Sequence, residues 1–457
     1  MEPTSLAAVQ EKQLSLFEGQ PQTNGVFRDS AFTENRKLPL HRWVPWIAGF
    51  SATFVDDVLS RFLNQPRRSS GAVLDPFAGV GTTLLQAYLR GFKVAGFEIN
   101  KYAALAARLK LSALKTDPRR LASLTDEYLS FYHKATSPRN GSPLSVPPSG
   151  FCTRHPFFSE RVERKVLITL DYINSIKEKL YQDYFRLAFG SVMVKVSNYS
   201  YEPSLGRRAS SGKDDVEDAP VDRVLSQKLH EMLGDIVWLQ RKMAGLPKPP
   251  SFKVYDSSFF DAREVLPAKS VDLVVTSPPY LNNYHYVRNT RPQMFWLDFV
   301  SSSMELGSYE ERSFGKFWQT VREDDAIPLA FRLKELETVL DTLRATNTHK
   351  GVYGGGGWAN YAATYFNDCG KFARLLKVLL KPKCHAVVVL GNSILQGVEV
   401  KTEYFFGEIA KLHGLKLVGI ELLRKKRTGA SIVNSSVRAN GVKTKATLAE
   451  FAVIVER

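Results

Sequence analysis

The interpretation of this chain depends on one segment, Val271-Asp272-Leu273-Val274-Val275-Thr276-Ser277-Pro278-Pro279-Tyr280. Its first half is a short apolar run, which predicts a buried strand. Neither proline can donate a backbone hydrogen bond, and both hold φ near about −65°, so the chain leaves the strand as a stiff segment. Its carbonyl oxygens can accept hydrogen bonds beside the Tyr280 ring, on which a flat base can stack. Alone, the pattern is equally typical of a proline-rich turn.

A second motif, Asp75-Pro76-Phe77-Ala78-Gly79-Val80-Gly81-Thr82-Thr83, follows another apolar run and precedes a helical pattern. Its glycines permit a tight strand-to-helix turn and close approach of a ligand to the backbone. The next predicted strand, residues 93–97, ends in Glu98. An acid about 20 residues after such a turn is placed to hold a ribose diol.

Together the two motifs resemble those of the DNA amino-methyltransferases, which use S-adenosylmethionine. The Ser-Pro-Pro-Tyr form is similar to the cytosine-N4 branch, whereas the adenine-N6 branch more often has Asp or Asn in place of the serine. The resemblance covers residues 35–110 and 250–457. It implies an α/β fold: a doubly wound, Rossmann-like class I methyltransferase sheet with a C-terminal antiparallel hairpin and a largely helical insertion.

The resemblance also implies contacts to the cofactor. The predicted cofactor-binding residues are Gly49, Phe50, Ser51, Asp75, Phe77, Gly79, Gly81, Thr82, Glu98, Ile99, Asp256 and Ser257. The glycine turn would surround the methionine part, Glu98 would take the ribose hydroxyls, and Asp256 would accept from the adenine amine. Two alternatives stay open: Ser51 as the cap of a helix at 53–62, and Asp256 as a turn residue.

The catalytic set implied by the resemblance is Ser277, Pro278, Pro279 and Tyr280. Ser277 Oγ and the Pro278 carbonyl would accept hydrogen bonds from the amine of a flipped-out base, and Tyr280 would stack on that base. Asn282, Asn283, Tyr284 and His285 continue the loop, with a structural role favoured for His285. No strong base is required, because the attacked nitrogen becomes acidic as the new bond forms.

The composition favours a polyanionic partner. The 457 residues include 62 Lys and Arg against 46 Asp and Glu, a net charge of +16. We expect double-stranded DNA, with candidate contacts at Arg207, Arg208, Arg424, Lys425, Lys426 and Arg427. A soluble basic protein without such a partner would have the same charge.

The cysteine pattern argues against three other kinds of site. Cys152, Cys369 and Cys384 are far apart in the sequence, which argues against disulfides, structural zinc and carbon-5 methylation through a cysteine adduct. We expect no metal, no membrane span and a cytoplasmic, nucleoid-associated protein. A cognate restriction endonuclease is a further expectation, and the oligomeric state stays open.

The domain prediction has four parts: a flexible tail at 1–35, the first part of the core at 36–115, a mainly helical insertion at 116–250, and the second part of the core at 251–457. The helical insertion, with expected helices at 162–179 and 224–243, is the candidate target-recognition region. A second insertion at 281–358 is its rival, and the glycines at 354–357 are expected to form a hinged lid or a linker.

Three alternative functions remain: DNA adenine-N6 methylation, RNA amine methylation, and a non-catalytic DNA-binding scaffold. The last predicts damaged motifs, and both motifs are intact in the sequence.

Overall fold

The computed structural model describes residues 27–28, 32–46, 49–63, 71–137, 142–201, 205–245, 249–282, 286–425 and 448–457. Its centre is a seven-stranded sheet with the order β10-β11-β7-β6-β1-β2-β5. The strands are β1 (Ala72–Asp75), β2 (Lys93–Phe97), β5 (Phe252–Tyr255), β6 (Val271–Thr276), β7 (Leu380–Gly391), β10 (Lys416–Lys425) and β11 (Ala449–Glu456).

The strand directions confirm the predicted α/β doubly wound sheet. β7, β6, β1, β2 and β5 pair in parallel. β11 is antiparallel to both β7 and β10, so the expected C-terminal hairpin is present, with β11 inside the sheet and β10 at its edge.

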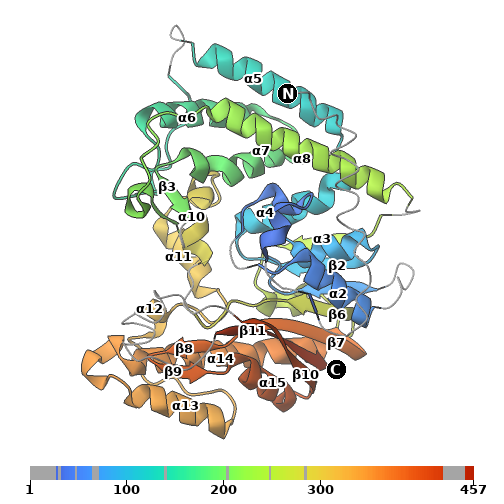
Figure 1. The fold of residues 1–457 in the computed structure, drawn as a ribbon, viewed down its shortest axis with the longest axis vertical. Helices are drawn as coiled ribbons and strands as arrows, with labels where there is room; N and C mark the ends of the chain where they lie inside the picture. The colour runs from blue at the N-terminus through green and yellow to red at the C-terminus, as the bar shows by residue number, and fades with distance from the viewer. Residues whose placement is uncertain are drawn as a thin grey trace.

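Helices cover both faces of the sheet (Figure 1), and alternate strand residues point to each. Val73 and Leu273 join the core that contains α2 (Ala52–Phe62), α3 (Thr82–Leu89) and α4 (Lys101–Ser112). Leu74 and Val274 join the opposite core, with α14 (Gly355–Leu379) and α15 (Thr402–Leu412). Because both faces are covered, β6 is buried along its whole length.

The helical insertion is present and lies at the opposite end of the molecule from α14 and α15 (Figure 1). It contains α5 (Pro118–Ala135), α6 (Glu160–Ser175), α7 (Lys179–Val192), α8 (Val221–Met243) and the hairpin of β3 (Tyr199–Tyr201) and β4 (Leu205–Arg207). The helix expected at 162–179 is α6, which already ends at Ser175, and α7 begins at Lys179. Gly190 of α7 lies so close to α4 that a Cβ there would be 2.5 Å from the Tyr102 ring. The insertion and the sheet therefore share one core.

The second insertion is also helical, with α10 (Tyr286–Trp296), α11 (Ser303–Glu311), α12 (Trp318–Val321) and α13 (Lys334–Ala345). The expected glycine lid or linker is wrong, because Gly355, Gly356 and Gly357 form the first turn of α14. A Cβ at Gly355 would lie 1.6 Å from the Leu343 carbonyl oxygen, so the glycines let α14 begin directly against α13.

The described part of the predicted N-terminal tail is anchored. Asn35 donates to the Phe50 carbonyl at 3.1 Å and accepts from the Ala52 amide at 2.8 Å. Arg28 forms an ion pair of 2.6 Å with Asp57 on α2. The sequence could not reveal these contacts, because they depend on α2 lying beside the tail.

Within the described ranges, no helix is long and apolar enough to span a bilayer. The His, Cys, Asp and Glu side chains of those ranges form no group that could hold a metal ion.

Candidate active site

The two sequence motifs meet at the carboxyl ends of β1 and β6. Asp75 ends β1 and is 1% exposed. Its Oδ1 accepts from the Thr276 hydroxyl at 2.6 Å and from the Phe77 amide at 3.1 Å. Burial raises the pKa of Asp75 to about 6. The Asp75 carboxylate thus connects the two motifs by hydrogen bonds. It does not line the pocket described next.

The turn after β1 requires its glycines. Gly79 and Gly81 have φ of 50° and 85°, values in the left-handed region. A Cβ at Gly81 would lie 3.0 Å from that of Ala107 on α4, and one at Gly79 would lie 3.4 Å from the Trp46 ring nitrogen. The buried ammonium of Lys110 donates to the carbonyl oxygen of Val80 at 2.8 Å, which supports the turn from α4.

Glu98 lies across the turn, where β2 ends. Its Oε2 accepts from the Gly79 amide at 2.8 Å, and its Oε1 accepts from the Asn100 amide at 2.7 Å. Desolvation raises the pKa of Glu98 to about 7, with smaller contributions from Asp75 and Asp256. Each carboxylate oxygen keeps acceptor capacity for a further donor, as a ribose diol would require.

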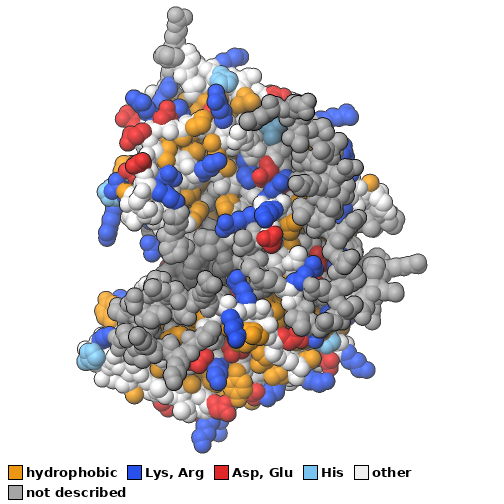
Figure 2. All heavy atoms as spheres, viewed as in Figure 1, with side chains coloured by type: hydrophobic (Ala, Val, Ile, Leu, Met, Phe, Trp, Pro, Cys, Tyr) orange, Lys and Arg blue, Asp and Glu red, His pale blue; other side chains and the backbone are white. Residues whose placement is uncertain are grey.

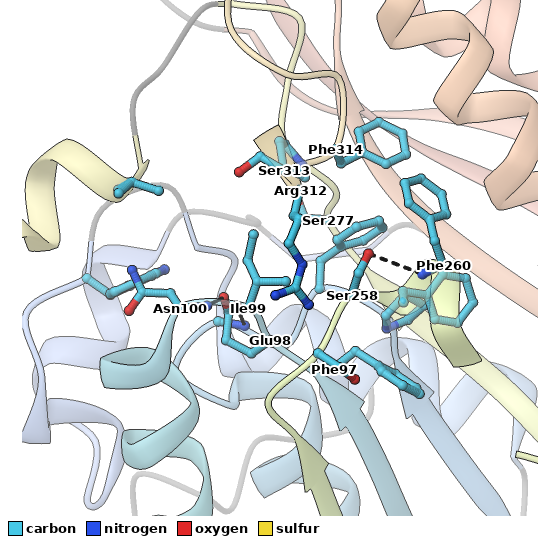
Figure 3. Close-up of a pocket in the computed structure, with 18 residues that line it drawn as sticks. Phe97, Glu98, Ile99, Asn100, Ser258, Phe260, Ser277, Arg312, Ser313 and Phe314 are labelled. Atoms are coloured by element: carbon cyan, nitrogen blue, oxygen red, sulfur yellow. Dashed lines mark hydrogen bonds between the residues drawn. The ribbon is translucent and has the colours of Figure 1, made fainter. Parts of the chain in front are cut away.

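A pocket of about 830 Å³, counted with its open mouth, lies above these groups. Seven predicted residues line it: Phe77, Gly79, Glu98, Ile99, Ser257, Ser277 and Pro279. Sequence reasoning missed the other residues of its wall: Trp46, Pro76, Phe97, Asn100, Ser258, Phe259, Phe260, Val287, Arg312, Ser313 and Phe314. Figure 3 shows side chains from the ends of several strands converging on this space.

The second insertion supplies one wall of the pocket. The Phe314 ring packs edge-on to Phe77 at 5.2 Å and is stacked with Phe260 at 6.0 Å between centroids. Gly315, with φ of 74°, lets the chain pass Tyr365, whose ring would be 2.6 Å from a Cβ there. Arg312 extends toward Ile99 and Ser258 (Figure 3). No local motif marks these residues, because they reach the pocket only through the packing of the insertion.

Several predicted cofactor residues do not line this pocket. Asp256 forms an ion pair with Arg108 of α4. Ser51 caps α2, since its hydroxyl accepts from the Phe54 amide at 3.1 Å. Their cofactor contacts stay predictions, as do those of the remaining predicted residues outside the wall: Gly49, Phe50, Asp75, Gly81 and Thr82.

The Ser-Pro-Pro-Tyr segment separates two pockets. Ser277 and Pro279 line the first. Tyr280 lines a second one of about 660 Å³, again counted with its mouth, together with Asn282, Trp358, Gly391 and Ser393, among others. Pro278 lines neither pocket. Asn283, Tyr284 and His285 lie outside the described residues.

Three of the candidate DNA-binding arginines have partners within the protein. Arg207 pairs with Asp215 at 2.8 Å, and Arg208 Nε donates to the Asp214 carbonyl at 2.8 Å. Both belong to regular structure, β4 and the following 3₁₀ turn. Arg424 pairs with Glu450 on β11.

Lys425 is exposed, whereas Lys426 and Arg427 lie outside the described residues. Figure 2 shows Lys and Arg side chains spread over the face in view, on the helical part and on the part below it, rather than gathered in one patch. The DNA contacts therefore stay predictions.

Comparison with solved structures gives only weak likeness. The rRNA methyltransferase aviRa from Streptomyces viridochromogenes is 11% identical, with 90% of this chain and 87% of that chain covered, at a TM-score of 0.29. A second structure of it gives 0.30. These scores are too low to support an argument, and no protein-family model matches the chain.

Sequence comparison gives two relatives. Type II methyltransferase M.BsoBI from Geobacillus stearothermophilus is 24% identical over 291 residues, which are 58% of this chain and 54% of the relative. Type II methyltransferase M.MvaI from Kocuria varians is 22% identical over 360 residues, 75% of this chain and 74% of the relative. The chain thus spans about half the length of the first relative and about three quarters of the second. Both relatives are type II methyltransferases, and each match takes in more than half of this chain.

Proposed function

We propose that this chain is an S-adenosylmethionine-dependent DNA methyltransferase that methylates the exocyclic N4 amine of a flipped-out cytosine, in a restriction-modification or related system. The observation that carries the proposal is the hydrogen bond from Thr276 to Asp75, which joins the Ser-Pro-Pro-Tyr segment to the glycine turn. Ser277 thereby lines the same pocket as Gly79 and Glu98. The similarity to two type II methyltransferases supports this function.

The residues of the pocket fit this cofactor. Gly79 brings bare backbone to the pocket wall, Glu98 can accept from the ribose hydroxyls, and the rings of Phe259, Phe260 and Phe314 offer apolar surface for the adenine. When bound, the cofactor supplies an activated methyl group on a sulfonium centre.

The chain's own residues would act by alignment. Ser277 Oγ and the Pro278 carbonyl would accept from the target amine, which favours a pyramidal nitrogen with its lone pair directed at the methyl carbon. Because Pro278 and Pro279 stiffen the segment, these acceptors are held in place before the base arrives. The Tyr280 ring would stack on the base, and the amine proton would leave to water after transfer.

Adenine N6 is the second candidate target, because the same arrangement can align either amine. Serine at position 277 favours cytosine only through the family resemblance. RNA amine methylation ranks third. A scaffold without catalysis ranks last, because the glycine turn and Glu98 form an intact site.

Nucleoside analysis tests the proposal. Purified chain is incubated with S-adenosylmethionine carrying a labelled methyl group and with unmethylated plasmid DNA or RNA, followed by digestion and mass spectrometry. We expect label in N4-methylcytosine from DNA and none with Ser277→Ala at equal times. Label in N6-methyladenine would move the chain to the sister branch. Label in RNA alone, or no label with either nucleic acid, would overturn the proposal.

A further inference from the structure

Glu450 contacts the tyrosine of the catalytic motif, although no sequence motif includes it. Its Oε1 accepts from the Tyr280 hydroxyl at 3.3 Å, and its Oε2 accepts from Nε of Arg424 on β10. The residue is 4% exposed. A buried carboxylate is stable only when it is paired and hydrogen-bonded, and Arg424 supplies the opposite charge.

The Tyr280 ring is fixed at a second point. It lies against Gly391 of β7, where a Cβ would be 3.3 Å from two ring atoms. Glu450 is the cross-strand partner of both Gly391 and Arg424 in the sheet register. One row across β7, β11 and β10 thus provides the bare backbone under the ring, the acceptor for its hydroxyl and the counter-ion of that acceptor.

We propose that Glu450 is a positioning residue that, with Arg424, holds the Tyr280 ring as a preorganised surface for the target base. This inference rests on the proposed function, which places the base on that ring. Ordering the ring before the base arrives removes an entropic cost from the reaction. Tyr280 does not line the cofactor pocket, so the effect falls on methyl transfer and not on cofactor binding. Arg424 then serves as an internal counter-ion rather than as a contact to DNA phosphate.

A double-mutant cycle tests this role. Glu450→Ala, Tyr280→Phe and the double variant are compared by steady-state methyl transfer to DNA. We expect each single change to lower kcat by about tenfold, typical of removing a hydrogen bond to a charged group. The double variant should be no slower than the slower single variant, because both changes remove the same interaction. Calorimetric affinity for S-adenosylmethionine should be unchanged.

Two further variants control for folding. Glu450→Gln keeps the size and an acceptor oxygen, so it should recover most of kcat. If Glu450→Ala does not fold, Tyr280→Phe, which removes only the hydroxyl, tests the same hydrogen bond. Glu456→Ala changes an acid on the same face of β11 that pairs with His385 at 3.3 Å, outside both pockets, and should leave kcat at the wild-type value.

Two results would overturn this inference and leave the proposed function standing. The first is a wild-type kcat in Glu450→Ala. The second is a double variant whose loss of kcat equals the product of the two single losses. Failure of the wild-type chain to methylate any DNA would overturn the proposed function and this inference with it.

Discussion

The Thr276 hydroxyl donates a 2.6 Å hydrogen bond to the carboxylate of Asp75, 201 positions earlier in the chain. Thr276 immediately precedes Ser277, and Asp75 opens the glycine turn. The contact therefore sets the spacing between the proposed amine acceptor and the proposed cofactor turn. It also satisfies a buried carboxylate that would otherwise be costly to enclose.

Thr276→Val should lower the free energy of unfolding by about 1–3 kcal/mol, because an isosteric methyl group leaves the buried Asp75 without this donor. Urea unfolding measures the change. Thr125→Val is the matched control: Thr125 is equally buried, but its hydroxyl donates only to the Leu121 carbonyl of its own helix, so it should cost less. Equal losses in both variants would show that the Asp75 contact adds nothing.

Ser277→Ala should slow methyl transfer by about 10²–10³-fold with nearly normal cofactor affinity, because it removes an acceptor aimed at the reacting amine. Single-turnover kinetics and calorimetry separate the two quantities. Ser270→Ala, before the opposite end of β6, removes a hydroxyl bonded to the Pro267 carbonyl and should transfer at the wild-type rate. A Ser277→Ala enzyme as fast as wild type would remove the serine from the mechanism.

Gly81→Ala should weaken S-adenosylmethionine binding and lower the melting temperature. The new Cβ meets Ala107 at 3.0 Å and must also adopt φ of 85°. Gly91→Ala is a close control, since Gly91 has φ of 86° with no atom within 4 Å of the added Cβ. It suffers only the backbone strain, about 1–2 kcal/mol. Comparable cofactor affinity in the two variants would contradict a packed turn beneath the cofactor.

Cofactor affinity should rise with pH and level off above about pH 7. The pKa of Glu98 is raised to about 7, and ribose hydroxyls prefer the ionised carboxylate, so binding releases a proton below that pH. The stability of the free protein shows the opposite sign: the contribution of Glu98 is complete below the ordinary pKa of 4.5 and is lost as pH rises to about 7. Calorimetry in buffers of different ionisation enthalpy measures the released proton. Glu98→Gln should bind weakly with a flat profile, and a sloping profile in that variant would assign the proton elsewhere.

DNA binding should weaken steeply with salt, because Lys and Arg side chains that neutralise phosphates release counterions. Neutralising Lys425, Lys426 and Arg427 together should reduce the slope of log K against log salt by about 0.9 for each phosphate that the protein no longer neutralises. Lys93→Gln with Lys269→Gln, at the amino ends of β2 and β6, is the control and should leave the slope unchanged. An unaltered slope in the triple variant would exclude this segment from the DNA interface.

The sequence was most informative where a residue with an expected chemical role directly follows a strand. β2 begins and ends where predicted, because it is a short run that lies between a glycine and an acid. Glu98 lines the pocket, since the carboxyl ends of parallel strands meet at one edge of the sheet, and its contact with the ribose stays a prediction.

The features that the sequence did not predict depend on tertiary contacts, which local sequence patterns do not record. The glycines at 355–357 form a helical turn rather than a linker, and at Gly355 the end of α13 lies too close for a side chain. The ion pair between Arg424 and Glu450 was not predicted, because local pattern cannot set the register of β10 and β11. The contact of Arg424 with DNA stays a prediction. Trp46 and Phe314 line the pocket from elements without any motif.

The contact between Gly190 of α7 and the Tyr102 ring of α4 has a consequence for engineering. Chimeras that exchange residues 116–250 with a relative, in order to change which DNA sequence is methylated, would graft a foreign helix onto this α4. A side chain at the position of Gly190 would collide with Tyr102, so a working exchange must either keep a glycine there or carry α4 with it, and α4 also holds Ala107 beneath the glycine turn. For a graft that carries α4, the cut point lies upstream of Asn100, inside what the sequence presents as the catalytic core.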